Sequence, residues 1–430
     1  MSVHFSVRWP HARRGAALLL STLALHAGET PAQGLTLPRA LARAAQDNPA
    51  LAAQPHDDRA AQAYVEQAGL RPNPEIGVSI ENFAGTGRIQ AVRGIETTVE
   101  ASQTWERGGK RAKRIDAARR DHEAVLKESA LRRIDVLAAA ATAYVETLAA
   151  QQRLTLAEEP LRLARETLDA VTARVRAAAG SPAEAARARA ALAVAQADFA
   201  RANAGLTAAR ATLAATWGGD ASEITAVTGR LQVPALPPDE HALAARLASH
   251  PRLELQRIAI AQRRAALALE QAQGVPDVTV GGGVRFLREG SDAGFVARLS
   301  VPLPVRNRNQ GNIRAARENL AAAELMIRAV ETELRTTFAA AWQDLTAAHA
   351  TVQNLRREAL PATEEAYTAV RRAYENGALP IVDVLDAQRA LAALHREILE
   401  AESAYATALA RLDALTDPTF TSLADLLAQP

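Results

Sequence analysis

The chain has 430 residues, and its composition excludes several classes of protein. It contains 0 Cys, which excludes a disulfide framework, a thiolate metal site, a cysteine nucleophile and a lipid attached to an N-terminal cysteine. Hydrophobic residues make up 48% and aromatic residues only 4%, a balance that favours long, alanine-rich helices over a thick core. The formal charge is +2, without a basic stripe interleaved with aromatic residues, so nucleic acid is not an expected partner.

The first 32 residues have the pattern of a secretory signal peptide. Arg13 and Arg14 precede an apolar run at 15–27 that is too short to span a bilayer, and small residues follow it. Cleavage is expected after Ala27 or Ala32, which leaves a mature chain close to neutral. The protein is therefore expected to be exported.

The chain also matches itself. The segment 40–54 aligns with 242–256 at an offset of 202 residues. Two further pairs of positions align in the same order, namely Pro74 with Pro276 and Gly180 with Gly377. Ordered matches along the whole chain predict a tandem duplication, with one repeat at 33–230 and the other at 231–430.

Each repeat is predicted to contain a helix, a β-hairpin, a very long helix, a turn and a returning helix. In the first repeat these elements are expected at 38–70, 74–105, 106–178, 179–182 and 183–217. In the second repeat they are expected at 238–274, 276–304, 308–376, 377–380 and 381–415, followed by a C-terminal tail at 416–430. Pro160 and Pro361 are expected to kink or break the long helices, because proline lacks the backbone N–H that a helix uses.

The strands alternate apolar and polar side chains. Ile76, Val78 and Ile80 share one face of the first strand, while Glu75 and Ser79 lie on the other. Such alternation over about ten residues is typical of a transmembrane β-barrel strand. An amphipathic hairpin that covers a helical core is the alternative. Four such strands are too few to close a barrel within one chain.

The helix turns, at Gly180-Ser181-Pro182 and at 377–380, combine glycine and proline as a helix stop and restart. Asp383 and Asp386 follow the second turn three residues apart, hence on one face of a helix. Carboxylates in a first turn often only complement the helix dipole. Under three-fold symmetry around a pore, the same pair would instead form a constriction of six carboxylates that attracts cations.

Three motifs carry a resemblance to a known family. They are Gly-Gly-Lys-Arg at 108–111, Ser-Val-Pro-Leu-Pro-Val-Arg-Asn-Arg-Asn-Gln-Gly-Asn at 300–312, and Tyr-Glu-Asn-Gly-Ala-Leu-Pro-Ile-Val-Asp-Val-Leu-Asp at 374–386. Together with the repeat, they resemble the TolC-type outer-membrane efflux proteins over essentially the whole mature chain. The first two motifs resemble the heavy-metal (CzcC-like) branch of that family.

The resemblance implies an α+β membrane protein of a Gram-negative outer membrane. It implies a homotrimer in which each chain gives four strands to a twelve-stranded barrel in outer-membrane lipid, while the long helices form a periplasmic α-barrel. It further implies contact with a periplasmic adaptor and an inner-membrane resistance-nodulation-division pump.

The resemblance also assigns roles to residues of the helix turns. Asp383 and Asp386 match the family's pore constriction, and Tyr374 matches a gate tyrosine. The other residues expected at the gate and the adaptor contact are Gly377, Leu379, Pro380, Gly180, Ser181 and Pro182. Leu379 stands where the family has a gate arginine, and Ala185 or Ala186 where it has that arginine's acidic partner. The latch between protomers that some relatives use is therefore not expected in the same form.

The expected function is a passive exit duct of a tripartite efflux system, with heavy-metal cations as substrate. A drug or protein export duct of the same fold and a non-channel periplasmic scaffold or adaptor are the alternatives. The nine His residues show no HxxxH or HExxH spacing. No catalytic site, cofactor or resident metal is therefore expected.

Overall fold

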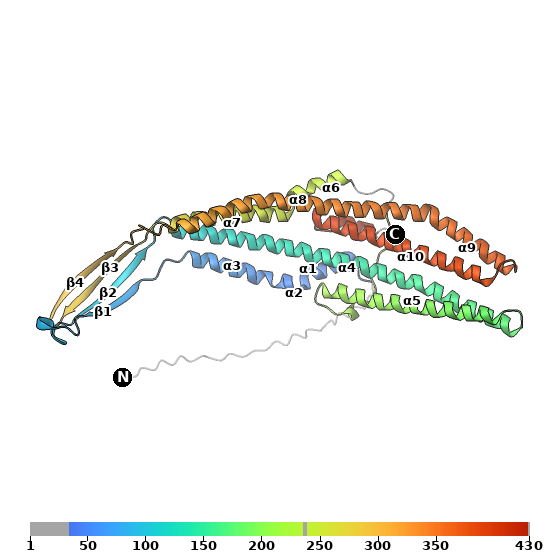
Figure 1. The fold of residues 1–430 in the computed structure, drawn as a ribbon, viewed down its shortest axis with the longest axis horizontal. Coiled ribbons are helices and arrows are strands. Elements are labelled where there is room, and N and C mark those ends of the chain that lie inside the picture. The colour runs from blue at the N-terminus through green and yellow to red at the C-terminus, as the bar shows by residue number, and fades with distance from the viewer. Residues whose placement is uncertain (1–33, 235–238, 429–430) are drawn as a thin grey trace, which may run out of the picture. The chain divides into compact units, whose positions relative to one another are not determined.

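The computed structural model describes residues 34–234 and 239–428. The expected signal peptide at 1–32 lies outside them. Helices dominate the described part, and a small sheet lies next to the ends of several of them (Figure 1). Among the described residues, no helix combines the length and the apolar character that crossing a membrane requires.

The first repeat contains five helices and two strands, apart from short 3-10 turns. In chain order they are α1 (Leu37–Asp47), α2 (Pro49–Ala52), α3 (Gln54–Ala68), β1 (Glu75–Glu81), β2 (Glu96–Trp105), α4 (Lys110–Arg176) and α5 (Pro182–Ala215). Because α5 runs back along α4, the two form a long helical hairpin (Figure 1).

The second repeat follows the same order and adds a short helix at its end. Its elements are α6 (Glu240–Arg246), α7 (Pro251–Gln273), β3 (Val278–Leu287), β4 (Asp292–Ser300), α8 (Gln310–Asn354), α9 (Leu360–Glu375), α10 (Ile381–Thr416) and α11 (Thr421–Ala428). Here α8 and α9 run out and α10 returns along them.

The expectation of one continuous helix at 38–70, and of another at 238–274, was wrong. The first is broken at Asn48 and Ala53, and the second ends a helix before His250 and restarts at Pro251. Asn48 and His250 adopt extended backbone because the proline that follows each disfavours the helical region. Each then caps the next helix with its own side chain, so the break recurs at equivalent positions of the two repeats.

The prolines of the two long helices differ in their effect on helix geometry. A kink or a break was expected at Pro160, and the break was wrong, because the α-helix α4 continues through this residue. The helix expected at 308–376 is instead interrupted by a π-helical turn at Leu355–Ala359, directly before Pro361. Proline cannot donate the backbone hydrogen bond that an α-helix requires. A π-turn accommodates one extra residue, so the helix can continue past this missing bond.

The four strands form one antiparallel sheet in the order β1-β2-β3-β4. The two hairpins meet where β2 pairs with β3, with Val99 opposite Val284. Within the described chain, β1 and β4 are therefore edge strands that pair on one side only.

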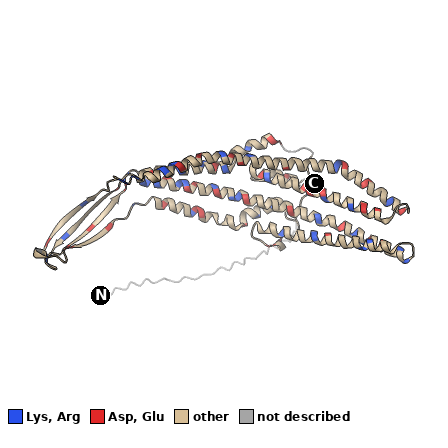
Figure 2. Cartoon of the chain, viewed as in Figure 1, with Lys and Arg blue, Asp and Glu red and all other residues tan. Residues whose placement is uncertain are grey.

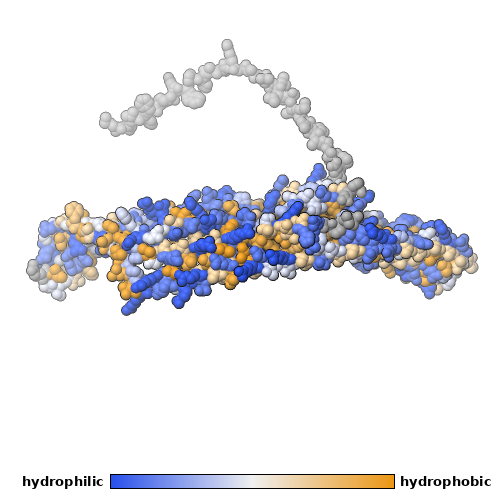
Figure 3. Space-filling view, turned by 90° about the horizontal axis from the view of Figure 1, so that it is seen from above, coloured by the Kyte–Doolittle hydropathy of each residue, from blue (hydrophilic) through white to orange (hydrophobic). Residues whose placement is uncertain are grey.

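The main core lies where helices from both repeats meet the C-terminal segment. Its largest fully buried side chains include Tyr144 and Leu148 of α4, and Leu412 of α10. The expected C-terminal tail contributes too, because Phe420 and the leucines of α11 pack into this core. Elsewhere the helices keep apolar residues at their surface, and Figure 3 shows them as hydrophobic patches between hydrophilic ones.

Candidate functional site: the helix turns and the two faces of the sheet

The turn between α4 and α5 is built from residues that stop one helix and start the next. Ala178 takes a left-handed conformation with φ 55°, which ends α4. Ser181 then caps α5, because its hydroxyl accepts from the backbone of Ala183 while Glu184 bonds back to the backbone of Ser181. Pro182 occupies the first helical position, where no backbone N–H is needed.

The turn between α9 and α10 uses glycine for the same reversal. Gly377 has a φ of 72°, a conformation that residues with a Cβ rarely adopt. Leu379 is half-buried, and Pro380 leads into α10 with extended backbone. Unlike the first turn, this one has no side-chain cap on the following helix.

The two helical hairpins pack against each other near their turns. Ile381 and Leu385 of α10 are buried in a small cluster with Val171 of α4 and Ala185 of α5. Ala185, one of the two residues expected near the family's acidic position, is buried here as part of the apolar packing. Small alanine side chains let the hairpins approach closely, and this cluster holds the two turns together.

A polar contact accompanies this cluster. The Nη1 atom of Arg174 donates to the hydroxyl of Tyr374 at 2.9 Å, and its guanidinium lies 5.8 Å from the centre of the tyrosine ring. Arg174 also donates to the carbonyl of Ala179 at 3.3 Å, so it links its own turn to the other hairpin. Sequence reasoning missed Arg174, because no spacing or motif pairs a residue of the first repeat with one 200 positions later.

The two aspartates lie on a different face of α10 from the packed residues. At about 100° of rotation per residue, Asp383 and Asp386 are roughly 60° apart and point away from the side that carries Ile381 and Leu385. Asp386 is exposed and accepts from Arg389 at 2.9 Å, while Asp383 makes no ion pair within the described residues. Asp383 is half-buried and Asp386 exposed, and both lie away from the cluster that packs around Ile381 and Leu385.

Between the hairpins, α4, α5 and α10 enclose a groove with a cavity volume of about 510 Å³. Alanine side chains form most of its wall, including Ala157, Ala195 and Ala392. Two ion pairs among its lining residues join the hairpins. Arg153 of α4 donates to Glu400 of α10 at 2.7 Å, and Arg396 of α10 lies 3.6 Å from Asp198 of α5. The charged groups present are thus paired, and the wall offers no nucleophile poised against a base.

The sheet has one apolar and one polar face. Strand register places Val78, Val99, Val284 and Phe295 in one row, all on the same side. Phe295 is 97% exposed, so this apolar face is uncovered in the single chain. The predicted alternation of apolar and polar side chains is therefore in register across all four strands.

The polar face carries ion pairs that cross the strands. Arg285 of β3 donates to Glu96 of β2 at 2.9 Å, and Arg298 of β4 approaches Glu100 of β2 at 3.1 Å. A hydrogen bond between the hydroxyls of Thr104 and Thr279 continues this face toward the helices. Among the described residues, no three side chains of His, Cys, Asp and Glu come together as a metal site would require.

A family model for outer membrane efflux proteins matches residues 40–219 and again residues 243–417. The chain belongs to the outer membrane efflux protein family. The double match also confirms the tandem duplication that the sequence predicts, since each segment covers one repeat.

Relatives within this family include two proteins of Cupriavidus metallidurans. The cobalt-zinc-cadmium resistance protein CzcC is 31% identical over 83% of this chain and 84% of its own length. The nickel and cobalt resistance protein CnrC is 34% identical over 74% of this chain and 75% of its own length. The predicted resemblance to the heavy-metal branch is thereby confirmed.

The fold is shared with solved efflux channels. The CmeC outer membrane channel of Campylobacter jejuni superposes with a TM-score of 0.71 at 16% identity, over 91% of this chain and 90% of that one. The outer membrane efflux protein described here therefore has the fold of these channels, with long helical hairpins and a four-stranded sheet. Its family assigns it to the outer membrane.

Proposed function

We propose that three copies of this chain assemble into a closed duct that crosses the outer membrane. The observation that carries this proposal is the four-stranded sheet with an uncovered apolar face and two edges, β1 and β4. Edge strands expose unpaired backbone groups, and closure into a barrel is the arrangement that satisfies all of them in lipid. If β1 of one copy pairs with β4 of the next, three copies close a ring of twelve strands with the apolar face outward.

In this assembly the helical hairpins would continue the duct through the periplasm. The turns at Gly180-Ser181-Pro182 and at Gly377–Pro380 would form its far end, where an adaptor and an inner-membrane pump of the resistance-nodulation-division type can dock. The duct itself would be passive, with no catalytic step of its own. Family membership and the packed, exposed helix turns support this arrangement.

Asp383 and Asp386 are proposed to line the narrowest point of the duct. Neither side chain belongs to the apolar cluster that joins the two hairpins, so three copies can bring six carboxylates around one axis. Carboxylates concentrated in this way attract cations and repel anions. Tyr374, held by Arg174, is proposed to act with Leu379 as part of the gate beside this constriction.

Heavy-metal cations are the proposed substrate class. The named relatives are resistance proteins for cobalt, zinc and cadmium, and for nickel and cobalt. The test is a strain that lacks this chain, complemented with the wild type or with an empty vector. Restored tolerance to divalent cobalt, zinc, cadmium or nickel, without a change in tolerance to hydrophobic drugs, is the expected result. Restored drug tolerance alone would favour a drug duct of the same fold.

A periplasmic scaffold or adaptor is the competing function, and extraction distinguishes it. A barrel in the outer membrane requires detergent for release and migrates as a trimer when the sample is not boiled. A scaffold would be released by salt as a soluble protein. Recovery in the salt wash would contradict the duct.

A further inference from the structure

Basic residues gather where the sheet meets the helices. The segments that join strands to helices, with the first turns that follow, are 69–74, 106–114, 274–277 and 301–314, and they contain nine Lys and Arg but two Asp and Glu. Figure 2 shows these positive residues at the beginnings of α4 and α8, beside the sheet. Because the sheet is antiparallel, all four segments leave it at the same end.

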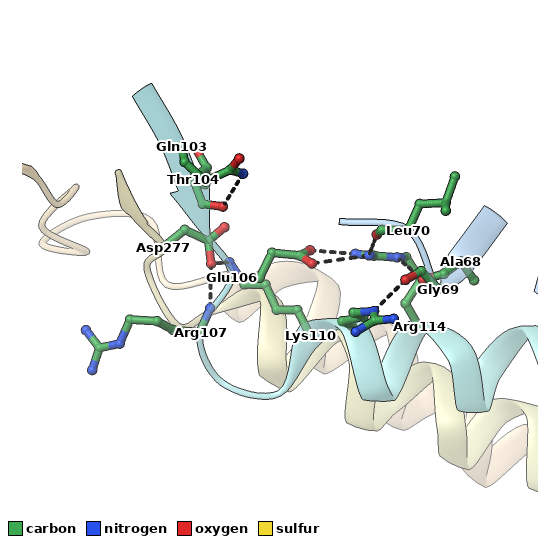
Figure 4. A network of polar contacts seen from close by, with 11 residues as sticks. Ala68, Gly69, Leu70, Gln103, Thr104, Glu106, Arg107, Lys110, Arg114 and Asp277 are labelled. Carbon is green, nitrogen blue, oxygen red and sulfur yellow. Dashed lines mark hydrogen bonds and ion pairs between the residues drawn. The ribbon is translucent and has the colours of Figure 1, made fainter. Parts of the chain in front are cut away.

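Part of this charge has a structural role inside the chain. Arg114 donates to the carbonyls of Ala68 and Leu70 at the end of α3 and holds Glu106 through two bonds, as Figure 4 shows. Lys110 pairs with Asp277 at 2.7 Å. Both acidic residues of these segments are therefore already neutralised by contacts with neighbouring cations.

The remaining basic side chains are exposed and have no carboxylate partner within the described residues. Arg111 is one of them, but it donates to the carbonyl of Gly69 and so also serves the joint between α3 and α4. The other six are Arg71, Arg107, Lys113, Arg306, Arg308 and Arg314. Figure 4 shows the side chain of Arg107 pointing away from the network. Lys113 and Arg314 lie in the early turns of α4 and α8, where positive charge opposes the helix dipole, so helix stability does not explain their placement.

Exposed apolar side chains lie between the sheet and the basic residues that follow β2 and β4. Trp105 at the end of β2 is 64% exposed, and Leu303 and Val305 after β4 are 80% and 73% exposed. Register places Trp105 on the apolar face of the sheet, opposite Val278. Along the strands, the apolar face is followed by an exposed tryptophan and then by basic residues. A bilayer has the matching order, from its acyl chains through the interface to the headgroup phosphates.

We propose that this band, defined by Arg71, Arg107, Lys113, Arg306, Arg308 and Arg314, binds the phosphates of acidic phospholipids in the periplasmic leaflet of the outer membrane. The inference rests on the proposed membrane-spanning duct and names the lipid contact that fixes its depth. Arginine suits this role because its planar guanidinium binds phosphate through two parallel hydrogen bonds.

Trp105 provides a local reporter of this contact. The chain has 4 Trp, and Trp217 and Trp342 are buried at 3% and 7% exposure in the helical part. The remaining tryptophan, Trp9, lies in the expected signal peptide at 1–32, so the mature protein is expected to lack it. Quenching of fluorescence by brominated lipid then reports on lipid next to Trp105, and Trp105→Phe is the control that should abolish it.

The test reconstitutes the full protein with brominated phosphatidylglycerol or brominated phosphatidylcholine at equal mole fraction. Quenching by phosphatidylglycerol should be about two-fold stronger, and 0.5 M NaCl should remove the difference because salt screens the attraction. The triple variant Arg107→Gln, Arg306→Gln, Arg308→Gln should lose most of the preference. The matched control, Arg187→Gln, Arg189→Gln, Arg372→Gln, removes three exposed arginines near the helix turns and should keep it.

Two negative outcomes separate the two proposals. Equal quenching by both lipids, or an unchanged preference in the triple variant, would overturn the lipid-phosphate band while leaving the duct intact. Absence of quenching by either lipid would show that Trp105 does not reach the membrane, which would contradict the proposed membrane-spanning duct itself.

Discussion

Asp413 shows how a single buried carboxyl couples the core to pH. It lies in α10 at 1% exposure, and its Oδ2 accepts from the backbone of Leu423 at 2.9 Å, which fixes the start of α11. Burial raises the pKa of Asp413 to about 6, since the charged form is poorly solvated there. Folding therefore favours the protonated form, and its contribution to stability is lost as pH rises from about 4 through 6.

Asp413→Asn should raise the melting temperature at pH 7.5 and flatten its dependence on pH between 4 and 7. The amide oxygen can still accept from Leu423, while the cost of a buried charge, on the order of 2 kcal/mol at neutral pH, disappears. Thermal melts monitored by circular dichroism across this pH range measure the effect. A lower melting temperature for the variant at pH 7.5 would show that the charge is needed.

For single residues, the sequence predicts which face of a helix a side chain occupies better than which residue of another hairpin it contacts. The spacing of Asp383 and Asp386 is enough to place both on one helix face, because helical geometry is local. The Arg174–Tyr374 hydrogen bond depends on how two hairpins pack, which no local pattern encodes. The same holds for Ala185, whose role as packing against Ile381 depends on the other repeat.

At the scale of secondary-structure elements, the two helical hairpins differ in the hydrogen bonds that cap the helix after each turn. Ser181 and Glu184 cap α5, whereas α10 has no side-chain cap, and a π-turn and Pro361 interrupt the outward arm of the second hairpin. The second hairpin is therefore the one with the weaker local reinforcement, and the Arg174–Tyr374 bond ties it to the first.

Tyr374→Phe should loosen this tie without disturbing the fold. The ring stays in its half-buried place, but Arg174 loses the acceptor, so stability should change by less than about 1 kcal/mol. Open probability in planar bilayers should rise if the bond holds the gate shut. Tyr367→Phe, on the same helix, serves as control. Equal open probability in all three proteins would contradict a gate function for the pair.

Strand alternation and helix boundaries could be predicted to a large extent, because both follow from local periodicity and from glycine and proline. The breaks at Asn48 and His250 were missed, although each precedes a proline, because long alanine-rich periodicity outweighed that signal. Pro160 was expected to kink or break α4, yet the helix does not break there, because packing of α4 against α5 and α10 supports it. Here tertiary contacts determine whether the helix continues through a proline, which local propensity alone does not.

For the molecule as a whole, the proposed assembly depends on which face of the sheet meets lipid. Val78 lies in the apolar row with Val99, while its neighbour Ser79 pairs with Thr98 on the polar face near Arg285. Val78→Asp should cost roughly 1–2 kcal/mol per chain in lipid, and three times that in a trimer. Ser79→Asp should be tolerated, because the guanidinium of Arg285 lies on the same polar face and can form an ion pair with the new carboxylate.

The measurement is the amount of trimer in detergent extracts of the outer membrane, compared on gels without boiling. Loss of trimer for Val78→Asp but not for Ser79→Asp is expected. Equal loss, or loss only for Ser79→Asp, would mean that the apolar face does not meet lipid and would contradict the barrel.

The central claim is a cation-attracting constriction in a duct, and single-channel conductance in a planar bilayer tests it most directly. Lanthanum is added to each side in turn, for the wild type and for Asp383→Ala, Asp386→Ala. The wild type should conduct and be blocked from one side, whereas the double variant should assemble equally well and conduct without block. A monomer without conductance, or a variant that lanthanum blocks as strongly as the wild type, would contradict the account.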